Sequence, residues 1–269
     1  MSAPTASLPM YNLPEMRGVN AAFWAALHGV LEEAELAAPA ELIFERPPVP
    51  ERIGGEVLLS QTCGYPLETI FRGQAIRLGT PCYDAEGCEG PTHCGVFVLP
   101  ADSRARSLRD LAGGVFLLNS RHSNSGMNLP RRALAEIAGS RSFFGEVIET
   151  GSQPGNLDRI ACGEGDATAV DCVTYEFWRR YRPDAASRTV ILARTPPSPA
   201  IPFVTSIATP AKTVEILREG LRRVAREPHF AAARAGLLIR DIVDVPAERY
   251  RALLDYESEA ARLGYATLA

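Results

Sequence analysis

The chain has 269 residues, of which 46% are hydrophobic and 22% are charged, and its formal net charge is −4. This length can bury a large core and is enough for two domains of ordinary size. The negative charge and the scattered arginines argue against a nucleic-acid surface. No stretch reaches the roughly 18 apolar residues that a membrane span needs. The composition therefore predicts a soluble globular protein that binds no nucleic acid.

The N-terminal residues 1–14 lack a basic region followed by an apolar one, so the sequence contains no recognisable secretory signal. Two explanations stay open: the protein remains in the cytoplasm, or the numbering begins after a leader was removed or mis-called. The cysteines do not decide the compartment, because a chain of this size needs no disulfide framework. They are Cys63, Cys82, Cys88, Cys94, Cys162 and Cys172.

The first predicted elements alternate between strands and helices. Strands are expected at residues 6–11, 41–44, 56–60 and 75–79. A long amphipathic helix follows Pro14, and a short helix is expected at residues 65–71. This alternation predicts a mostly parallel sheet flanked by helices.

A second alternating set follows a loop at residues 80–92 that is rich in Gly, Pro, Cys and acidic residues. Its strands are expected at residues 94–99, 115–118, 147–149, 167–170 and 189–193, and its helices at 107–111, 129–137, 157–162 and 174–181. A proline-stiffened link then leads to a strand at 203–208 and helices at 214–225 and 247–263. The pattern predicts two α/β lobes.

The chain is expected to cross between these lobes twice, near residues 94–100 and 196–203. The first lobe would then be discontinuous, comprising residues 1–97 plus 202–269, and the second would comprise 98–201. In open α/β sheets ligands bind at the carboxyl ends of the strands. We therefore expect a ligand cleft between the lobes.

A polar turn after the strand at 115–118 carries Ser123, Asn124 and Ser125 and opens a helix. These residue types cap helix starts, where unpaired N–H groups and the helix dipole favour an anion. Taken alone, the stretch favours an ordinary cap that binds nothing. Other turns that follow predicted strands also carry hydroxyls and amides, with one carboxylate at Asp171, and they favour a ligand site.

An ordered set of short motifs resembles the phosphonate/phosphate-type substrate-binding proteins of ABC transporters, which have the two-domain type II periplasmic-binding fold. The motifs are LPMY at 8–11, QTCGYP at 61–66, SNSG at 123–126, FFG at 143–145, TGS at 150–152 and GDATAVD at 165–171. The resemblance implies a two-lobed α/β fold. It also implies a non-catalytic protein that closes by a hinge on a small polar, oxyanion-bearing ligand, in ABC transport or as a related sensor.

The resemblance also implies a set of ligand-binding residues, namely Tyr11, Tyr65, Ser123, Asn124, Ser125, Gln153 and Asp171. The serine-rich helix start would hold the oxyanion, the tyrosines would line the cleft from the first lobe, and Asp171 would take a donor such as an amine. Gln153 stands where the family typically has His, and Asn124 replaces a hydroxyl residue. Both departures favour a ligand that is less charged than phosphonate or differently shaped.

Each assignment has a plainer alternative. The two tyrosines could be core aromatics, and Asp171 could merely cap the helix that follows it. Gln153 could be a solvated loop amide. Arg121 and His122 could be surface residues, or one of them could supply the positive charge that Gln153 lacks.

Two competing functions stay open. Cys63 could be a nucleophile if a histidine lay beside it, which would favour an enzyme on the same scaffold. The loop between Cys82 and Cys94 also holds His93 and three acidic residues, which would suit zinc, although its spacing favours a linking loop with incidental thiols. We expect no cofactor and no catalysis.

The expected partners are a small anionic or zwitterionic ligand and an ABC permease, and the chain is expected to act as a monomer. The resemblance implies a periplasmic location. Because the N-terminal sequence has no recognisable secretory signal, the cytoplasm stays open as an alternative.

Overall fold

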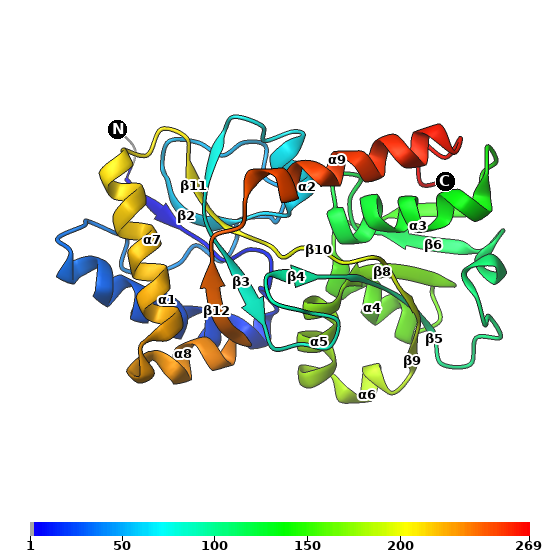
Figure 1. The fold of residues 1–269 in the computed structure, drawn as a ribbon. Coiled ribbons are helices and arrows are strands. Elements are labelled where there is room, and N and C mark those ends of the chain that lie inside the picture. Colours follow the sequence, from blue (N-terminus) through cyan, green and yellow to red (C-terminus); the bar gives the residue numbers. More distant parts are fainter. Residues whose placement is uncertain (1–2) are drawn as a thin grey trace. The chain divides into compact units, whose positions relative to one another are not determined.

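The computed structural model describes residues 3–269 and divides into two compact units. Unit 1 comprises Met1–Asp84, Glu89–Thr92 and Pro199–Ala247, and unit 2 comprises Ala85–Cys88, His93–Ser198 and Glu248–Ala269. Each unit is built around one five-stranded sheet flanked by helices (Figure 1). The expectation of two α/β lobes is confirmed.

The sheet of unit 1 has the strand order β1-β2-β11-β3-β12. These strands are β1 (Thr5–Ala6), β2 (Val57–Gln61), β3 (Ala75–Tyr83), β11 (Phe203–Ser206) and β12 (Ile239–Val243). β1 and β2 pair in parallel, whereas β11 is antiparallel to both β2 and β3, and β12 is antiparallel to β3. Three of the four pairings are thus antiparallel, because β11 and β12 run opposite to β1, β2 and β3, and the expectation of a mostly parallel sheet is wrong for this unit.

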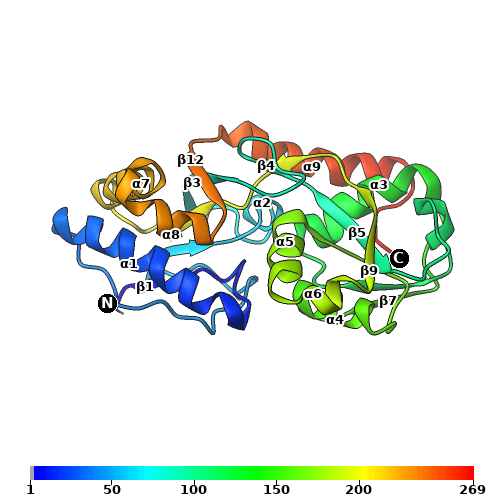
Figure 2. The same ribbon diagram turned by 90° about the horizontal axis from the view of Figure 1, so that it is seen from below.

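The helices of unit 1 are η1 (Pro14–Met16), α1 (Arg17–Glu33), α2 (Gly64–Glu68), α7 (Ala211–Arg226), η4 (Pro228–Phe230) and α8 (Ala231–Gly236). Phe23 of α1 stacks on Phe203 of β11 with ring centroids 5.7 Å apart, which places α1 against the sheet. α7 lies beside α1 (Figure 2) and approaches it so closely at Gly220 that an added Cβ would lie 3.0 Å from Leu27.

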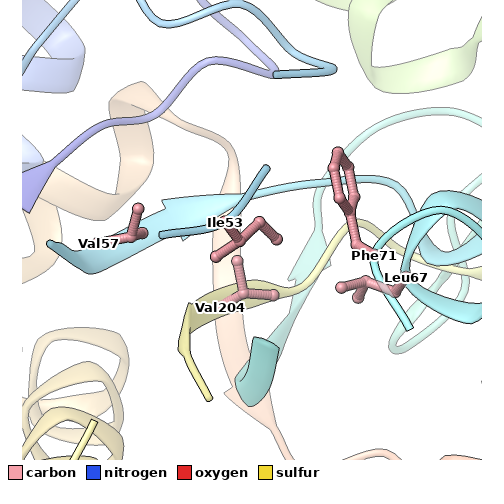
Figure 3. Packing of buried hydrophobic residues seen from close by; sticks show 5 residues of the cluster. All are labelled: Ile53, Val57, Leu67, Phe71 and Val204. Carbon is pink, nitrogen blue, oxygen red and sulfur yellow. The ribbon is translucent and has the colours of Figure 1, made fainter. Parts of the chain in front are cut away.

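A core cluster joins α2 to the sheet of unit 1. Figure 3 shows its five side chains, which are Ile53, Val57, Leu67, Phe71 and Val204. Phe71 follows α2 and is 1% exposed, and Val204 of β11 is fully buried. The burial of Leu67 and Phe71 holds the helix that carries Tyr65 on the sheet.

The sheet of unit 2 has the order β7-β6-β8-β5-β9. These strands are β5 (Gly95–Pro100), β6 (Val115–Leu118), β7 (Glu146–Glu149), β8 (Ala167–Asp171) and β9 (Thr189–Arg194). β6 pairs in parallel with both β7 and β8, whereas β5 is antiparallel to β8 and β9. Two short strands, β4 (Thr92–His93) and β10 (Ser198–Pro199), form a separate two-stranded sheet.

The helices of unit 2 are η2 (Leu108–Leu111), η3 (Asn124–Asn128), α3 (Leu129–Ala138), α4 (Gln153–Ala161), α5 (Cys172–Tyr181), α6 (Pro183–Ala186) and α9 (Ala247–Arg262). α3 and α9 lie on one face of the sheet and α4, α5 and α6 on the other (Figures 1 and 2). Among the described helices of both units, none combines the length and the apolar content needed to cross a membrane.

Two expected strands differ from the structure. The first is only Thr5–Ala6 instead of residues 6–11, since Pro9 lacks the N–H that would continue a ladder. Residues 41–44 form no strand, although the Ile43 N–H donates to the Ala6 carbonyl over 2.8 Å. This segment therefore lies beside β1 but is held there by a single ladder bond.

The two units also differ from the expected lobes of 1–97 plus 202–269 and 98–201. Unit 2 begins its main segment at residue 93, so it contains all of β5, and it contains α9 from residue 248. The reason is a set of polar contacts: Asn128 Nδ2 donates to the Leu253 carbonyl over 3.0 Å, and Arg132 Nε donates to Glu259 over 2.5 Å. The last helix thus packs on α3 instead of returning to unit 1.

Candidate ligand-binding site

Three turns of unit 2 lie at one edge of its sheet. β6, β7 and β8 run parallel and are neighbours in the order β7-β6-β8, so their carboxyl ends lie at the same edge. β6 leads to η3, β7 to α4 and β8 to α5. The side chains on these three turns are therefore brought together although they are far apart in the sequence.

The turn after β6 carries Ser123, Asn124 and Ser125, which we call the serine turn. Ser123 caps the helix, because its Oγ accepts a hydrogen bond from the Gly126 N–H at 3.0 Å. The Asn128 N–H donates to the Ser123 carbonyl, five residues back, so the first turn is wider than an α-turn. η3 continues directly into α3, which gives the serine turn the N-terminus of a helix that runs from residue 124 to 138.

Gln153, the first residue of α4, connects the serine turn to β8. Its Nε2 donates to Ser125 Oγ at 3.0 Å and to Ser123 Oγ at 3.4 Å. Its Oε1 accepts a hydrogen bond from the backbone N–H of Asp171 at 3.1 Å. One neutral amide thus holds the hydroxyls of the serine turn in place and fixes the end of β8.

The side chain of Asn124 is used within the protein. It is 1% exposed, and its Nδ2 donates to Ser198 Oγ at 3.0 Å. Its Oδ1 accepts from Asn128 Nδ2 at 3.4 Å. These contacts explain an amide at a position where a hydroxyl was expected, since it links the helix start to β10.

Asp171 caps α5. Its Oδ1 accepts hydrogen bonds from the N–H groups of Val173 and Thr174, and its Oδ2 accepts from the Thr174 hydroxyl. The residue is 1% exposed, and burial raises the pKa of its carboxyl, which nearby His93 and the Thr174 hydrogen bonds oppose. The structure thus places Asp171 in the helix cap, and its contact with a ligand stays a prediction.

His93 is a neighbour of the site that the sequence suggested only as a metal ligand. It is 1% exposed, and its Nδ1 lies 4.0 Å from Asp171 Oδ1. Within residues 3–269 this Nδ1 has no hydrogen-bond partner. No motif marks this residue, because its place in β4, next to the end of β8, depends on the tertiary fold.

The two cationic candidates of the sequence lie on the exposed side of the same turn. Arg121 pairs with Glu149 at 3.9 Å and donates to the Leu268 carbonyl at 3.2 Å. His122 is exposed. Arg121 therefore already has an acidic partner and a carbonyl partner on the surface.

Tyr11 and Tyr65 belong to unit 1. Tyr11 is 4% exposed, and its ring packs edge-on against Tyr83 with centroids 5.4 Å apart. Tyr65 lies in α2 and is 5% exposed. Both are part of the buried interior of their unit, which agrees with the plainer of the two interpretations and leaves their contact with a ligand a prediction.

The zinc interpretation of the loop at residues 82–94 finds no support. Among the described His, Cys, Asp and Glu residues, no group of three or more is arranged to hold a metal ion. Two of the loop's acids form ion pairs, Asp84 with Arg240 and Glu86 with Arg194. Cys63 is buried as the residue before α2.

Comparison with known proteins identifies a family and a fold. The family described as "ABC transporter, phosphonate, periplasmic substrate-binding protein" matches residues 82–250. A comparison with curated protein sequences gave no significant match.

Several solved structures are similar to the chain. A binding protein component of an ABC phosphonate transporter from Pseudomonas aeruginosa has a TM-score of 0.70 and 14% identity, with 97% of each chain covered. XAC2383 from Xanthomonas citri bound to ATP has a TM-score of 0.68 and 17% identity, covering 97% of this chain and 98% of that one. PhnD1 from Prochlorococcus marinus in complex with methylphosphonate has a TM-score of 0.62 and 15% identity, covering 89% and 84%. At these identities the likeness establishes the fold.

Proposed function

Because the chain belongs to the family of phosphonate periplasmic substrate-binding proteins of ABC transporters, we propose that its ligand is a small molecule with a phosphonate- or phosphate-like oxyanion, held at the serine turn. The observation that carries this proposal is the pairing of Gln153 with Ser123 and Ser125 at the start of a helix. A helix N-terminus favours negative charge, and the hydroxyls can donate to the oxyanion.

The neutrality of Gln153 limits the charge of the ligand. Arg121 is paired with Glu149, and the three side chains of the serine turn are uncharged. Backbone N–H groups and hydroxyls suit an oxyanion that bears a single charge, whereas a dianion would call for a cation. We therefore favour a monoanionic headgroup or a zwitterionic ligand over a free dianion.

The test is a calorimetric titration of the purified protein with phosphate, phosphite, methylphosphonate, a sulfonate and a carboxylate. We expect one oxyanion class to bind. Ser125→Ala should weaken binding about 10- to 100-fold, because a hydrogen bond to a charged group contributes about 1.5–3 kcal/mol. Ser123→Ala should weaken binding and also lower stability by about 1 kcal/mol through loss of the cap.

Ser152→Ala is the matched control. Ser152 caps α4 as Ser123 caps η3, since its Oγ accepts from the Gly155 N–H at 3.1 Å, and it is exposed. This variant should show the same loss of stability with unchanged affinity. Binding that survives both Ser123→Ala and Ser125→Ala would refute the serine turn as the anion site.

Chemical analysis of the ligand after incubation tests whether the protein is non-catalytic. The bound ligand should be recovered chemically unchanged after prolonged incubation with the protein, whereas accumulation of a product would favour an enzyme on the same scaffold. A monomeric state, a periplasmic location, an ABC permease as partner and hinge closure on the ligand remain proposals. For closure, the expected observation is a ligand-dependent decrease of the radius of gyration in X-ray scattering.

A further inference from the structure

Three cysteines of unit 2 lie together beside the start of α5. The sulfur atoms of Cys88 and Cys172 are 3.5 Å apart, and the Cys94 thiol also hydrogen-bonds Cys172. Cys94 and Cys172 are buried, whereas Cys88 is partly exposed. Since 84 residues separate Cys88 from Cys172, only the fold brings the thiols together.

Gly87 permits this arrangement. Its φ is +93°, and a Cβ built on it would lie 2.8 Å from Cys94 Sγ and 3.4 Å from Cys172 Sγ. A residue with a side chain would therefore push residues 85–88 away from the thiols. The glycine lets this loop lie directly on the other two sulfur atoms.

Cys172 is the thiol best placed to be the nucleophile. It is the first residue of the ten-residue helix α5, and both other thiols hydrogen-bond it. These two donors and the nearby His93 lower the pKa of the Cys172 thiol despite its burial. The same contacts and burial raise the pKa values of Cys88 and Cys94, so Cys172 holds a negative charge most readily of the three thiols.

We propose that Cys88 and Cys172 form a reversible disulfide by thiol–disulfide exchange with a small-molecule disulfide oxidant. The Cys88 proton first passes to Cys172 along their hydrogen bond, and the partly exposed Cys88 thiolate attacks the oxidant RSSR, bonds to one SR group and expels the other as RS⁻. This RS⁻ takes the proton from Cys172 and leaves as RSH. The Cys172 thiolate then attacks Cys88 Sγ and expels the second SR as RS⁻, which takes a proton from water. Two cysteines are oxidised and one RSSR is reduced.

The position of the backbone favours Cys88 over Cys94 as the partner. The Cys172 N–H donates to the Cys94 carbonyl at 2.9 Å, and the next residues, Gly95 and Asp171, pair across the sheet. The backbone of Cys94 is therefore fixed by its own carbonyl and by the pairing of the next residue, Gly95. Residues 85–88 form a loop that can shorten the sulfur separation from 3.5 Å to the roughly 2.05 Å of a disulfide.

The experiment uses the full chain, reduced, freed of metals with a chelator and then incubated with oxidised glutathione. Free thiols are blocked with N-ethylmaleimide, and disulfides are mapped by mass spectrometry. We expect a Cys88–Cys172 disulfide that dithiothreitol removes, and a mixed disulfide with glutathione at exposed Cys162. This outcome does not depend on any ligand of the serine turn.

Two variants sharpen the result. Cys162→Ser should keep the Cys88–Cys172 disulfide, and Cys88→Ser should abolish it with an unfolding curve close to that of the parent chain. Recovery of Cys88 and Cys172 as free thiols or as separate glutathione adducts, while Cys162 has reacted, would overturn the proposal. So would a disulfide of Cys172 with Cys94 in the parent chain.

Discussion

The amide of Gln153 makes contacts within the protein that a solvated loop residue would not make. It donates to both hydroxyls of the serine turn and accepts from the Asp171 N–H. The side chain therefore sets which lone pairs and protons of Ser123 and Ser125 remain for a ligand. Its neutrality makes the affinity for anions sensitive to a charge placed there.

Gln153→Glu should weaken binding of an oxyanion at least 100-fold. The substitution keeps the shape of the side chain but places a carboxylate beside the anion, and like charges at close range in a poorly hydrated site repel strongly. Calorimetric titration measures the loss, with far-UV circular dichroism to check the fold. An unchanged affinity would mean that the ligand lies away from this side chain.

The stability of the protein should depend on the protonation of Asp171. Because burial raises the pKa of its carboxyl in the folded state, the folded protein binds this proton more tightly than the unfolded chain does. The contribution to stability is thus present below the unfolded pKa and declines as pH rises towards the folded pKa. The decline is about 1.4 kcal/mol for each pH unit within that window.

Asp171→Asn should remove this decline, because the amide oxygen can still accept the cap hydrogen bonds. The variant should therefore become more stable relative to the parent chain as pH rises from about 4 towards neutrality, that is, its free energy of unfolding should increase relative to that of the parent. Denaturant unfolding at a series of pH values measures the difference. A constant difference between the two proteins would argue against a raised pKa at Asp171.

Two buried side chains, one within helix α2 and one after it, hold this helix on the sheet of unit 1. Its five residues are too few to be stable alone, and Leu67 and Phe71 bury it against β2 and β11 (Figure 3). Phe71→Ala should therefore lower the free energy of unfolding by about 3–5 kcal/mol. The neighbouring Ile70, 39% exposed, offers the control Ile70→Ala, which should cost far less. Denaturant unfolding distinguishes the two.

The elements predicted well are those whose signal is local. β6 was predicted with its observed bounds, 115–118, because it is a short apolar run between glycines and polar turn residues. α8 and β12 were missed, because the alanine-rich segment 231–236 has no apolar periodicity and the charged Arg240 and Asp241 interrupt the apolar run of β12. Tertiary pairing with β3 makes β12 a strand.

The candidate site divides in the same way. The serine turn, Gln153 and Asp171 could be predicted as neighbours, because each follows a strand of a parallel set. The contact of Cys88 with Cys172 could not, since it joins a loop to a helix start 84 residues away. The place of α9 was predicted wrongly, because a sequence pattern does not tell which of two sheets a helix will cover.

Each unit should unfold cooperatively although it is built from three separate segments of the chain. Asn128 Nδ2 donates to Leu253, and Arg131 Nη2 donates to Asn128 Oδ1 at 2.7 Å. Asn128→Ala leaves buried partners unsatisfied and should destabilise unit 2 by about 2–3 kcal/mol. In hydrogen exchange, α9 should then lose protection together with β6 and β8, while β2 and β11 keep theirs. Loss confined to α9 would contradict this cooperative unit.

The order in which the chain is synthesised has a consequence for when it can fold. The sheet of unit 1 cannot assemble fully until its strands at residues 203–206 and 239–243 have been made. Unit 2 lacks its last helix until residue 262 has been made. A nascent chain therefore exposes incomplete edges of unit 1 throughout the synthesis of β5 to β9. Unit 1 is complete only after residue 243 has been made and unit 2 only after residue 262, so neither unit can finish folding while β5 to β9 are being synthesised.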